Sequence, residues 1–152
     1  MSHTRILVAT DGSDSSAVAL QKAAMIALDE GWGIDLLHVI DTRQYTTGFG
    51  QTGSVDGKLL YDAEQRAQEH LDDLLQPLIA QGIDAKPHIR FGSPRAVIAF
   101  DAVKDYRTGL IVIGRSSKKL VSRMFIGSVA SFVVENAACD VLIVTNPDVT
   151  NE

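Results

Sequence analysis

The residues best suited to hold an anion lie in a stretch without acidic side chains, from Tyr106 to Val134. Gly127 and Ser128 open a predicted helix there, and the free N–H groups of a helix start attract negative charge. Its basic side chains are Arg107, Arg115, Lys118, Lys119 and Arg123, and its hydroxyl donors include Ser116, Ser117 and Ser128. The pattern favours a phosphate ligand, while a solvated basic loop before an ordinary helix start explains the same residues.

The charge of the whole chain limits the partners that we expect. The 152 residues include 14 basic and 19 acidic side chains, which gives a formal net charge of −5. Because the acid-free stretch carries +5, the rest of the chain carries −10. Nucleic acids and anionic membranes attract proteins with a surplus of positive charge, so we expect neither as a partner. A small polyphosphate fits one short basic stretch better.

Short apolar runs alternate with helical patterns along the whole chain, which has the length of one domain. Strands are predicted over residues 6–9, 34–40, 85–91, 110–113 and 141–144. Helices are predicted over residues 17–28, 58–80, 94–106 and 127–137. This alternation predicts an α/β fold in one domain over residues 1–152, with a doubly wound, five-stranded parallel sheet and helices on both faces.

Ligands of such sheets bind outside the carboxyl ends of the strands, where the strand order reverses. The candidate site residues are therefore those that end or follow strands. They are Ala9, Thr10 and Asp11 after the first strand, Val39, Ile40 and Asp41 at the end of the second, and Ile113, Gly114, Arg115, Ser116 and Ser117 after the fourth. Gly127, Ser128 and Val129, at the start of the next helix, complete the predicted site.

Local signals predict how several elements begin and end. Gly31 and Gly33 should stop the first helix, and Ser93 should cap the helix that begins at Pro94. Residues 41–57 are predicted to form a long surface loop. The apolar stripe of the second helix is Leu60, Ala63, Ala67, Leu71, Leu74 and Leu78, with Pro77 near its last turn.

Other possible motifs lack the context that their chemistry needs. Residues 48–53 match GxGxxG, but a dinucleotide fingerprint must lie tightly between a strand and a helix. We interpret them as a loop, which could still fold over a nucleotide as a lid. Cys139 is expected to be a packed structural thiol, and His38 a hydrogen-bonded core histidine. The four histidines show no metal-ligand spacing, so no metal site is predicted.

Three segments together resemble the universal stress protein family over nearly the whole chain. Residues 6–13 (ILVATDGS) and 36–41 (LLHVID) resemble its first two strands. Its ATP-binding members carry Gly-x2-Gly-x9-Gly-Ser, and this chain has Gly114-x2-Ser117-x9-Gly127-Ser128. Ser117 replaces the second glycine, and Ala9 stands where those members usually have proline.

The resemblance implies one universal stress protein domain with strand order 3-2-1-4-5 and roles for the matching residues. Asp11 would contact the ribose or adenosine, and Val39 would meet the adenine through its backbone. The ribose and phosphates would be lined by Gly114, Ser116 and Ser117, with the phosphates bound by Gly127 and Ser128. The resemblance also implies a homodimer that pairs through the last strand, Val141 to Val144.

The sequence thus predicts a cytoplasmic stress-response protein that binds ATP, with Mg²⁺ as the companion of the phosphates. The single cysteine favours a reducing compartment. No activated base is evident, so at most slow ATP hydrolysis is expected. Two alternatives stay open: a nucleotide-free, dimeric interaction protein of the same fold, which Ser117 and Ala9 favour, and a slow nucleotide phosphohydrolase.

Overall fold

A five-stranded parallel sheet forms the centre of the computed structural model, which describes residues 4–47, 54–55, 57–116 and 126–146. Its strands are β1 (Arg5–Ala9), β2 (Gly33–Ile40), β5 (Ala85–Phe91), β6 (Thr108–Gly114) and β7 (Asp140–Val144). They lie in the order β5-β2-β1-β6-β7, and each neighbouring pair is parallel. The predicted fold class and the order 3-2-1-4-5 are confirmed.

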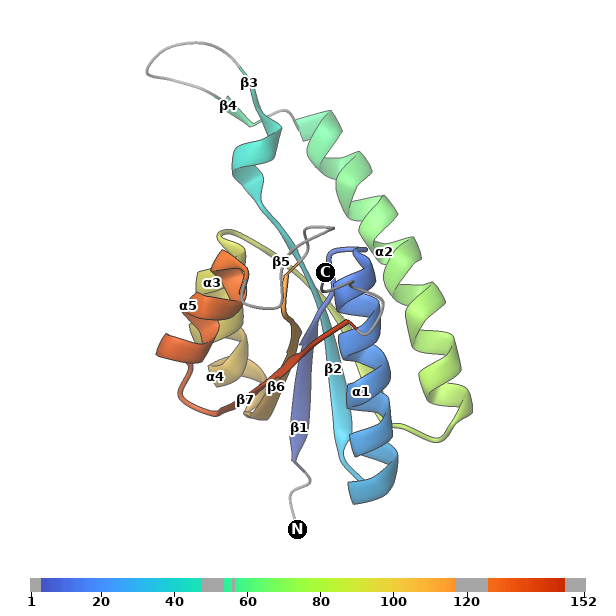
Figure 1. Cartoon of the computed structure of the whole chain (residues 1–152). Helices are drawn as coiled ribbons and strands as arrows, with labels where there is room; N and C mark the ends of the chain where they lie inside the picture. The colour runs from blue at the N-terminus through green and yellow to red at the C-terminus, as the bar shows by residue number, and fades with distance from the viewer. Residues whose placement is uncertain (1–3, 48–53, 56, 117–125, 147–152) are drawn as a thin grey trace, which may run out of the picture.

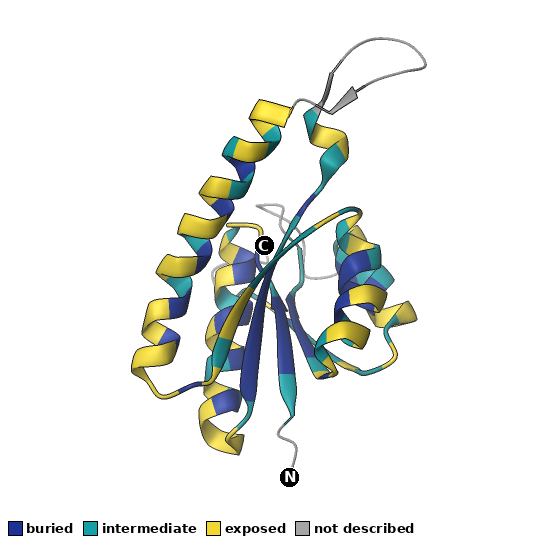
Figure 2. Cartoon of the chain, turned by 180° about the vertical axis from the view of Figure 1, so that it is seen from behind, coloured by how far each residue is buried: buried dark blue, intermediate teal, exposed yellow. Residues whose placement is uncertain are grey.

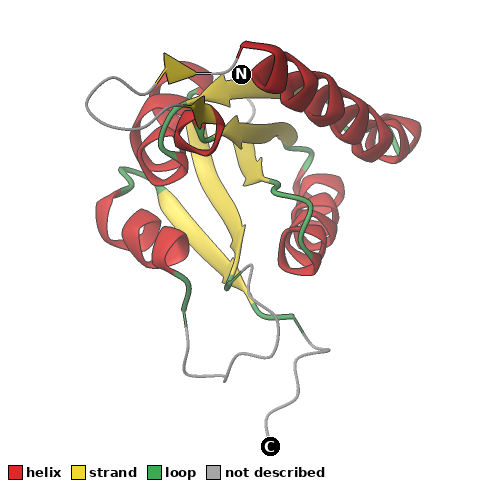
Figure 3. Cartoon of the chain, turned by 90° about the horizontal axis from the view of Figure 1, so that it is seen from above, coloured by secondary structure: helices red, strands yellow, loops and turns green. Residues whose placement is uncertain are grey.

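Helices cover both faces of this sheet (Figures 1 and 3). On one face, α1 (Asp14–Glu30) and α2 (Gly57–Ala80) pack on strand residues such as Ile6 and Val8. On the other, α5 (Ser128–Asn136) and the helical segment 94–106 pack on residues such as Leu7. Because successive strand side chains point to opposite faces, β1 contributes to both cores. The central strands are therefore buried, whereas the outer surface of α2 is exposed (Figure 2).

The first helix is stabilised at both ends by local interactions. The Ser13 hydroxyl accepts a hydrogen bond from the Ser16 N–H at 3.2 Å, which satisfies one of the free donors at the N-terminus of α1. Gly31 ends the helix with a φ of 73°, in the left-handed region that glycine adopts without strain. The prediction that Gly33 also stops this helix is wrong, because Gly33 is the first residue of β2.

Replacing Ser13 with alanine should lower the free energy of unfolding by about 1 kcal/mol, because the helix loses its capping acceptor. Ser93 provides a matched control: it precedes Pro94 at a helix start, but its side chain makes no capping hydrogen bond. Ser93→Ala should therefore change stability by only a few tenths of a kcal/mol. Urea unfolding of both variants measures the difference, and equal losses would contradict the capping role of Ser13.

Two predictions for the middle of the chain need correction. Leu75, at 8% exposure, belongs to the buried side of α2, whereas Leu74 is only half-buried. The predicted loop 41–57 contains a 3-10 turn, η1 (Thr42–Tyr45), and an antiparallel pair formed by β3 (Thr46–Thr47) and β4 (Ser54–Val55). Its GxGxxG match, residues 48–53, lies outside the described residues.

The predicted helix 94–106 is continuous but contains one segment of wider helix. It consists of α3 (Pro94–Ala96), the π-helical η2 (Val97–Asp101) and α4 (Ala102–Tyr106). Such segments arise where one residue is accommodated without its usual i→i−4 hydrogen bond, and they are frequent near functional sites. The π segment includes Ile98, whose side chain lies between the sheet and the cavity described below.

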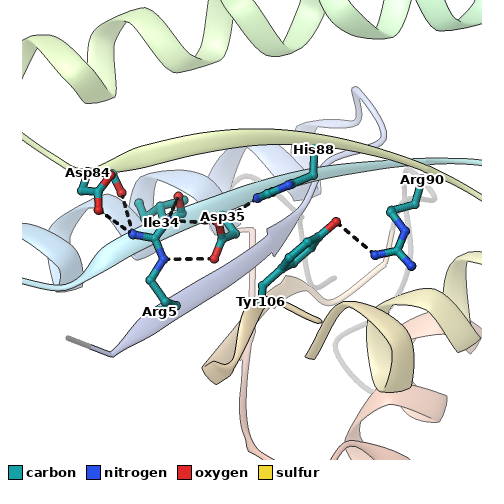
Figure 4. Close-up of polar contacts among 7 residues, drawn as sticks. All are labelled: Arg5, Ile34, Asp35, Asp84, His88, Arg90 and Tyr106. Atoms are coloured by element: carbon teal, nitrogen blue, oxygen red, sulfur yellow. Dashed lines mark hydrogen bonds and ion pairs between the residues drawn. The ribbon is translucent and has the colours of Figure 1, made fainter. Parts of the chain in front are cut away.

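A charged network lies within the sheet at the amino ends of the strands (Figure 4). Asp35 is 3% exposed, and its carboxylate accepts hydrogen bonds from the Arg5 guanidinium at 3.0 and 3.1 Å. His88 Nε2 lies 2.8 Å from Asp35 Oδ1, and the His88 ring stacks on Tyr106 with a centroid separation of 3.9 Å. A buried carboxylate needs such partners, so the network joins β1, β2 and β5.

Candidate functional site

A cavity of about 810 Å³ opens at the carboxyl ends of β1, β2 and β6. Its volume lies within the range of ordinary small-molecule sites. The first turns of α1, α3 and α5 and the turn η1 complete its walls. From β1 the chain continues to β2 and β5 on one side of the sheet and later to β6 and β7 on the other side. The cavity lies at this reversal of the strand order, where ligands of doubly wound sheets bind.

The cavity brings together every predicted site residue that the structure describes. These are Ala9, Thr10, Asp11, Val39, Ile40, Asp41, Ile113, Gly114, Arg115, Ser116, Gly127, Ser128 and Val129. Ser117 lies outside the described residues, as do Lys118, Lys119 and Arg123. Segments far apart in sequence therefore meet at one edge because parallel strands end there together.

The start of α5 presents backbone donors to this cavity. Gly127 is the N-cap, and its carbonyl accepts the first helical hydrogen bond, from Ser131 N–H at 2.9 Å. The N–H groups of Ser128, Val129 and Ala130 consequently have no acceptor within the helix. No side chain caps this helix end in the described structure. The N–H groups at this helix start are thus not occupied by a capping side chain.

Gly127 is required by a close approach between two segments. Its N–H donates to the Arg115 carbonyl at 2.8 Å. A Cβ atom at this position would lie 3.3 Å from both the Arg115 carbonyl oxygen and Ser116 Cα, which is tighter than most carbon contacts. A side chain here would therefore press α5 away from the strand β6 and its following turn.

Gly114 is also required, but for a reason that the sequence did not reveal. A Cβ atom at Gly114 would lie 2.6 Å from the Ser15 carbonyl oxygen and even closer to the Ser15 hydroxyl. The missing side chain thus makes room for the first turn of α1. This packing places Ser13, Ser15 and Ser16 on the cavity wall.

The turn between β1 and α1 holds Thr10 and Asp11 in distinct positions. Thr10 is 5% exposed, and its backbone N–H donates to the Leu37 carbonyl at 2.8 Å. Asp11 is exposed, and its Oδ1 accepts the Ser13 N–H at 2.9 Å. Asp11 lines the cavity, and a carboxylate can accept further hydrogen bonds, such as one from a ligand hydroxyl.

One wall of the cavity is apolar and can pack against a flat ring. Val39, Ile113 and Val129 form it together with Pro94 and Ile98 from the segment 94–106. An apolar wall opposite a few fixed polar groups is the usual composition of a small-molecule site. The geometry is therefore suited to a ligand with an apolar ring at one end and an anionic group at the other.

The turn η1 adds residues that the sequence analysis did not select. Gln44 and Tyr45 line the cavity, and Asp41 binds Arg43 at 2.7 Å. The hydrogen bond from the Arg43 side chain lowers the pKa of Asp41, against the opposing effect of burial. The Asp41 charge is thus compensated by Arg43 rather than left free to repel an anionic ligand.

Several lining residues had no local signal in the sequence. Pro94 and Ile98 line the cavity from the helical segment 94–106, which connects β5 to β6. Tyr45 lines it from η1, which follows β2. His38 also lines the cavity; it is half-buried, and a hydrogen bond with the Thr10 backbone contributes to its pKa. Its Nδ1 is buried but has no hydrogen-bond partner among the described residues.

The part of the chain that the structure describes shows no cluster of three or more His, Cys, Asp or Glu side chains arranged to hold a metal ion. None of its helices combines the length and apolar character needed to cross a membrane.

Comparison with known sequences identifies one family over almost the whole chain. The family model described as "Universal stress protein family" matches residues 3–145. A putative universal stress protein of Staphylococcus epidermidis is 29% identical over 159 aligned positions, covering 100% of this chain and 90% of the relative. One from Staphylococcus aureus is 28% identical and covers 95% of this chain and 85% of the relative.

Solved structures share the fold. Universal stress protein UspA from Lactobacillus plantarum is 26% identical, with a TM-score of 0.75 over 95% of this chain and 99% of that chain. The universal stress protein from Archaeoglobus fulgidus in complex with dAMP is 25% identical, with a TM-score of 0.65 over 94% and 98% of the two chains. Other structures of the fold hold cAMP or, from Arabidopsis thaliana, AMP, at 22% and 21% identity.

The sequence match, the strand order β5-β2-β1-β6-β7 and the cavity at the carboxyl ends of its strands lead to the same assignment. The Gly114 and Gly127-Ser128 positions of the family motif lie together on that cavity. By sequence and by fold, this chain belongs to the universal stress protein family.

Proposed function

We propose that the cavity binds an adenine nucleotide and that ATP is its physiological ligand. The observation that carries this proposal is the open N-terminus of α5, whose first residues line a cavity that also has apolar lining residues, such as Val39 and Ile98. The dAMP complex of the Archaeoglobus fulgidus protein supports the class of ligand. The AMP and cAMP complexes of proteins with this fold support it further.

Each end of the nucleotide has suitable partners. The adenine would pack on the apolar wall and meet the Val39 backbone, and Asp11 would accept a hydrogen bond from the ribose.

The phosphates would bind the N–H group and the hydroxyl of Ser128, beside Gly127. Gly114 and Ser116 would lie near the phosphates, and Ser117 would add a hydroxyl. Thr10, Ile113 and Val129 would complete the site, and Ala9 would lie at its base. Mg²⁺ would accompany the phosphates.

We expect at most slow ATP hydrolysis at this site. Of the carboxylates that line the cavity, Asp11 accepts a backbone hydrogen bond and Asp41 is paired with Arg43. In the described part of the chain, neither carboxylate makes a hydrogen bond with a histidine or with a second carboxylate. Fast hydrolysis generally needs a base positioned on the attacking water.

The test is to denature the protein purified from cells and analyse the released small molecules by mass spectrometry. Recovery of ATP in nearly equal amount to the protein would support the proposal. Absence of nucleotide, together with no thermal shift on adding ATP, would support a nucleotide-free interaction protein. ADP release under turnover conditions, abolished by Gly127→Val, would support the phosphohydrolase.

We further propose that two copies of the chain pair through β7, which is one edge of the sheet, and that the protein acts in the cytoplasm. Val141, Leu142 and Ile143 are half-buried, and apolar edges invite pairing with another chain. The cytoplasm suits the single cysteine, Cys139, which has no disulfide partner in the chain.

Ile143→Asp should convert the dimer to a monomer in sedimentation velocity, because a carboxylate cannot be buried at an apolar strand pair. Ile89→Asp is the matched control, since Ile89 is also half-buried but lies on β5 at the opposite edge. The control should remain dimeric. A folded Ile143→Asp variant that stays dimeric would refute this interface.

A further inference from the structure

A second, smaller cavity of about 260 Å³ lies between α2 and the carboxyl ends of β1 and β2. It shares Asp11, His38 and Tyr45 with the first cavity, so these side chains form the boundary between the two. Its remaining walls come from Gly12, in the turn between β1 and α1, and from α2. No residue of α5 and no residue of β6 lines it, so it is separate from the proposed phosphate-binding helix start.

The cavity exists because α2 carries small residues where it passes the carboxyl ends of β1 and β2. Ala63 and Ala67 are one helical turn apart and are 6% and 4% exposed. One turn further along, Leu71 begins the run of buried leucines that fills the space between α2 and the sheet. The two alanines leave the corresponding space above the end of β2 open.

Hydrogen-bond donors dominate the polar walls of this cavity. Arg66 projects from α2 and makes no ion pair with any described residue. His70, one turn further along α2, lies with its Nε2 3.4 Å from the Thr10 hydroxyl. Tyr45 contributes a phenol from η1. A guanidinium, imidazoles and hydroxyls together suit a ligand whose surface consists of acceptor oxygens.

His38 supplies an unsatisfied polar atom at the boundary. Its Nδ1 is buried and has no hydrogen-bond partner among the described residues. A buried polar atom without a partner costs free energy, which a bound ligand or water can recover. The groups facing His38 are Asp11 and Thr10 from the end of β1, Tyr45 from η1, and Arg66 and His70 from α2.

These surroundings disfavour the protonated form of His38. Burial lowers the pKa of His38, and the positive charge of His70 lowers it further, while Asp11 and the Thr10 backbone act in the opposite direction. A negative charge placed in the cavity would favour the protonated forms of both histidines. The Asp11 carboxylate, whose Oδ1 accepts the Ser13 N–H, opposes an anion in this cavity, whereas the Arg66 guanidinium attracts it.

We propose that the second cavity binds a phosphate group through Arg66 and His70, with His38 taking up a proton as the phosphate enters. The phosphate comes either from free inorganic phosphate or from a phosphate ester. Binding forms no covalent bond and transfers only a proton from solvent to the imidazole. The site is distinct from the proposed phosphate-binding start of α5, since neither Gly127 nor Ser128 lines it, although the two cavities share Asp11, His38 and Tyr45.

The experiment is a titration of the full chain with inorganic phosphate, followed through the histidine ring signals by NMR. The His38 and His70 signals should shift saturably, and the pKa values of both should rise. His88, which is paired with Asp35, serves as an internal reference that should not shift. A parallel titration with ATP distinguishes an ester from the free ion as the source of the phosphate. Because His38 lines both cavities, this titration is repeated with Gly127→Val, and only shifts that persist in that variant are assigned to the second cavity.

Arg66→Gln and His70→Gln should each weaken the binding that shifts His38 by about tenfold, the value expected for one hydrogen bond between charged partners. Lys22→Gln, an exposed charge change on α1, is the matched control and should leave it unchanged. Failure of both inorganic phosphate and ATP to shift His38 and His70, or an unchanged affinity in Arg66→Gln, would overturn the proposal. Absence of bound ATP in the purified protein would contradict only the proposed function, because the phosphate titration does not require it.

Discussion

Arg5→Met should lower the free energy of unfolding by about 3 kcal/mol, because it leaves the Asp35 carboxylate buried without its main cationic partner. Arg5 donates to both oxygens of Asp35 and also to the Ile34 carbonyl at 3.0 Å (Figure 4). His88 remains as a single partner in the variant. Such a loss is large against the roughly 5–15 kcal/mol that stabilise a typical domain. Urea unfolding at neutral pH measures it.

Asp84→Asn is the matched control for this network. Asp84 also accepts a hydrogen bond from Arg5, at 2.9 Å, but its side chain is 70% exposed. Exposed ion pairs contribute little, so the control should cost less than about 1 kcal/mol. A similar loss of stability in both variants would show that burial of Asp35 is not what makes Arg5 important.

The effect of Arg5→Met should also depend on pH. Burial alone would raise the pKa of Asp35, but hydrogen bonds from His88 and Arg5 outweigh it and lower the pKa below its ordinary value. The network therefore stabilises the fold fully at pH values above the pKa of Asp35 in the unfolded chain, about 4. This stabilisation is lost as the pH falls through the lower pKa that Asp35 has in the folded protein. The stability gap between wild type and Arg5→Met should be full at pH 7 and shrink below about pH 4. A gap that stays constant down to pH 3 would contradict this account.

Gly127→Val should weaken ATP binding about 100-fold, which corresponds to the loss of one or two hydrogen bonds to a charged phosphate. The added side chain would meet the Arg115 carbonyl oxygen and Ser116 Cα, which a Cβ alone approaches to 3.3 Å. The start of α5 must then shift, and its N–H groups lose their direction toward the cavity. Isothermal titration calorimetry with ATP measures the change.

Val134→Ala is the control for this variant, because Val134 is 49% exposed on the same helix and does not line the cavity. It should leave ATP affinity unchanged. Circular dichroism should confirm that Gly127→Val still folds. An unchanged affinity in the folded Gly127→Val variant would refute the placement of the phosphates at the start of α5.

Much of the fold follows from patterns within short segments. Apolar runs separated by helical periodicity predicted the strands and helices, and the alternation of the two predicted a parallel sheet. Because the carboxyl ends of parallel strands meet at one edge, residues as distant as Asp11, Val39 and Gly114 could be assigned to one cavity before the structure was known. The order of the strands came from the family resemblance, since periodicity does not determine which strands are neighbours.

Other features depended on contacts between elements and had no local signal. Asp35 lies within an apolar run, and only the strand register places Arg5 and His88 beside it. Gly114 could be assigned to a strand end, but its close approach to Ser15 depends on how α1 packs against β6.

The sequence by itself determined the elements of this protein, the face that each buries and the strand ends that carry its candidate nucleotide site. Only the tertiary structure revealed the second cavity, where Ala67 and His70 of α2 and His38 of β2 line the same space. The physical reason is that periodicity along the chain records which side of an element is buried, whereas the partner of a side chain depends on register and helix packing across the whole core.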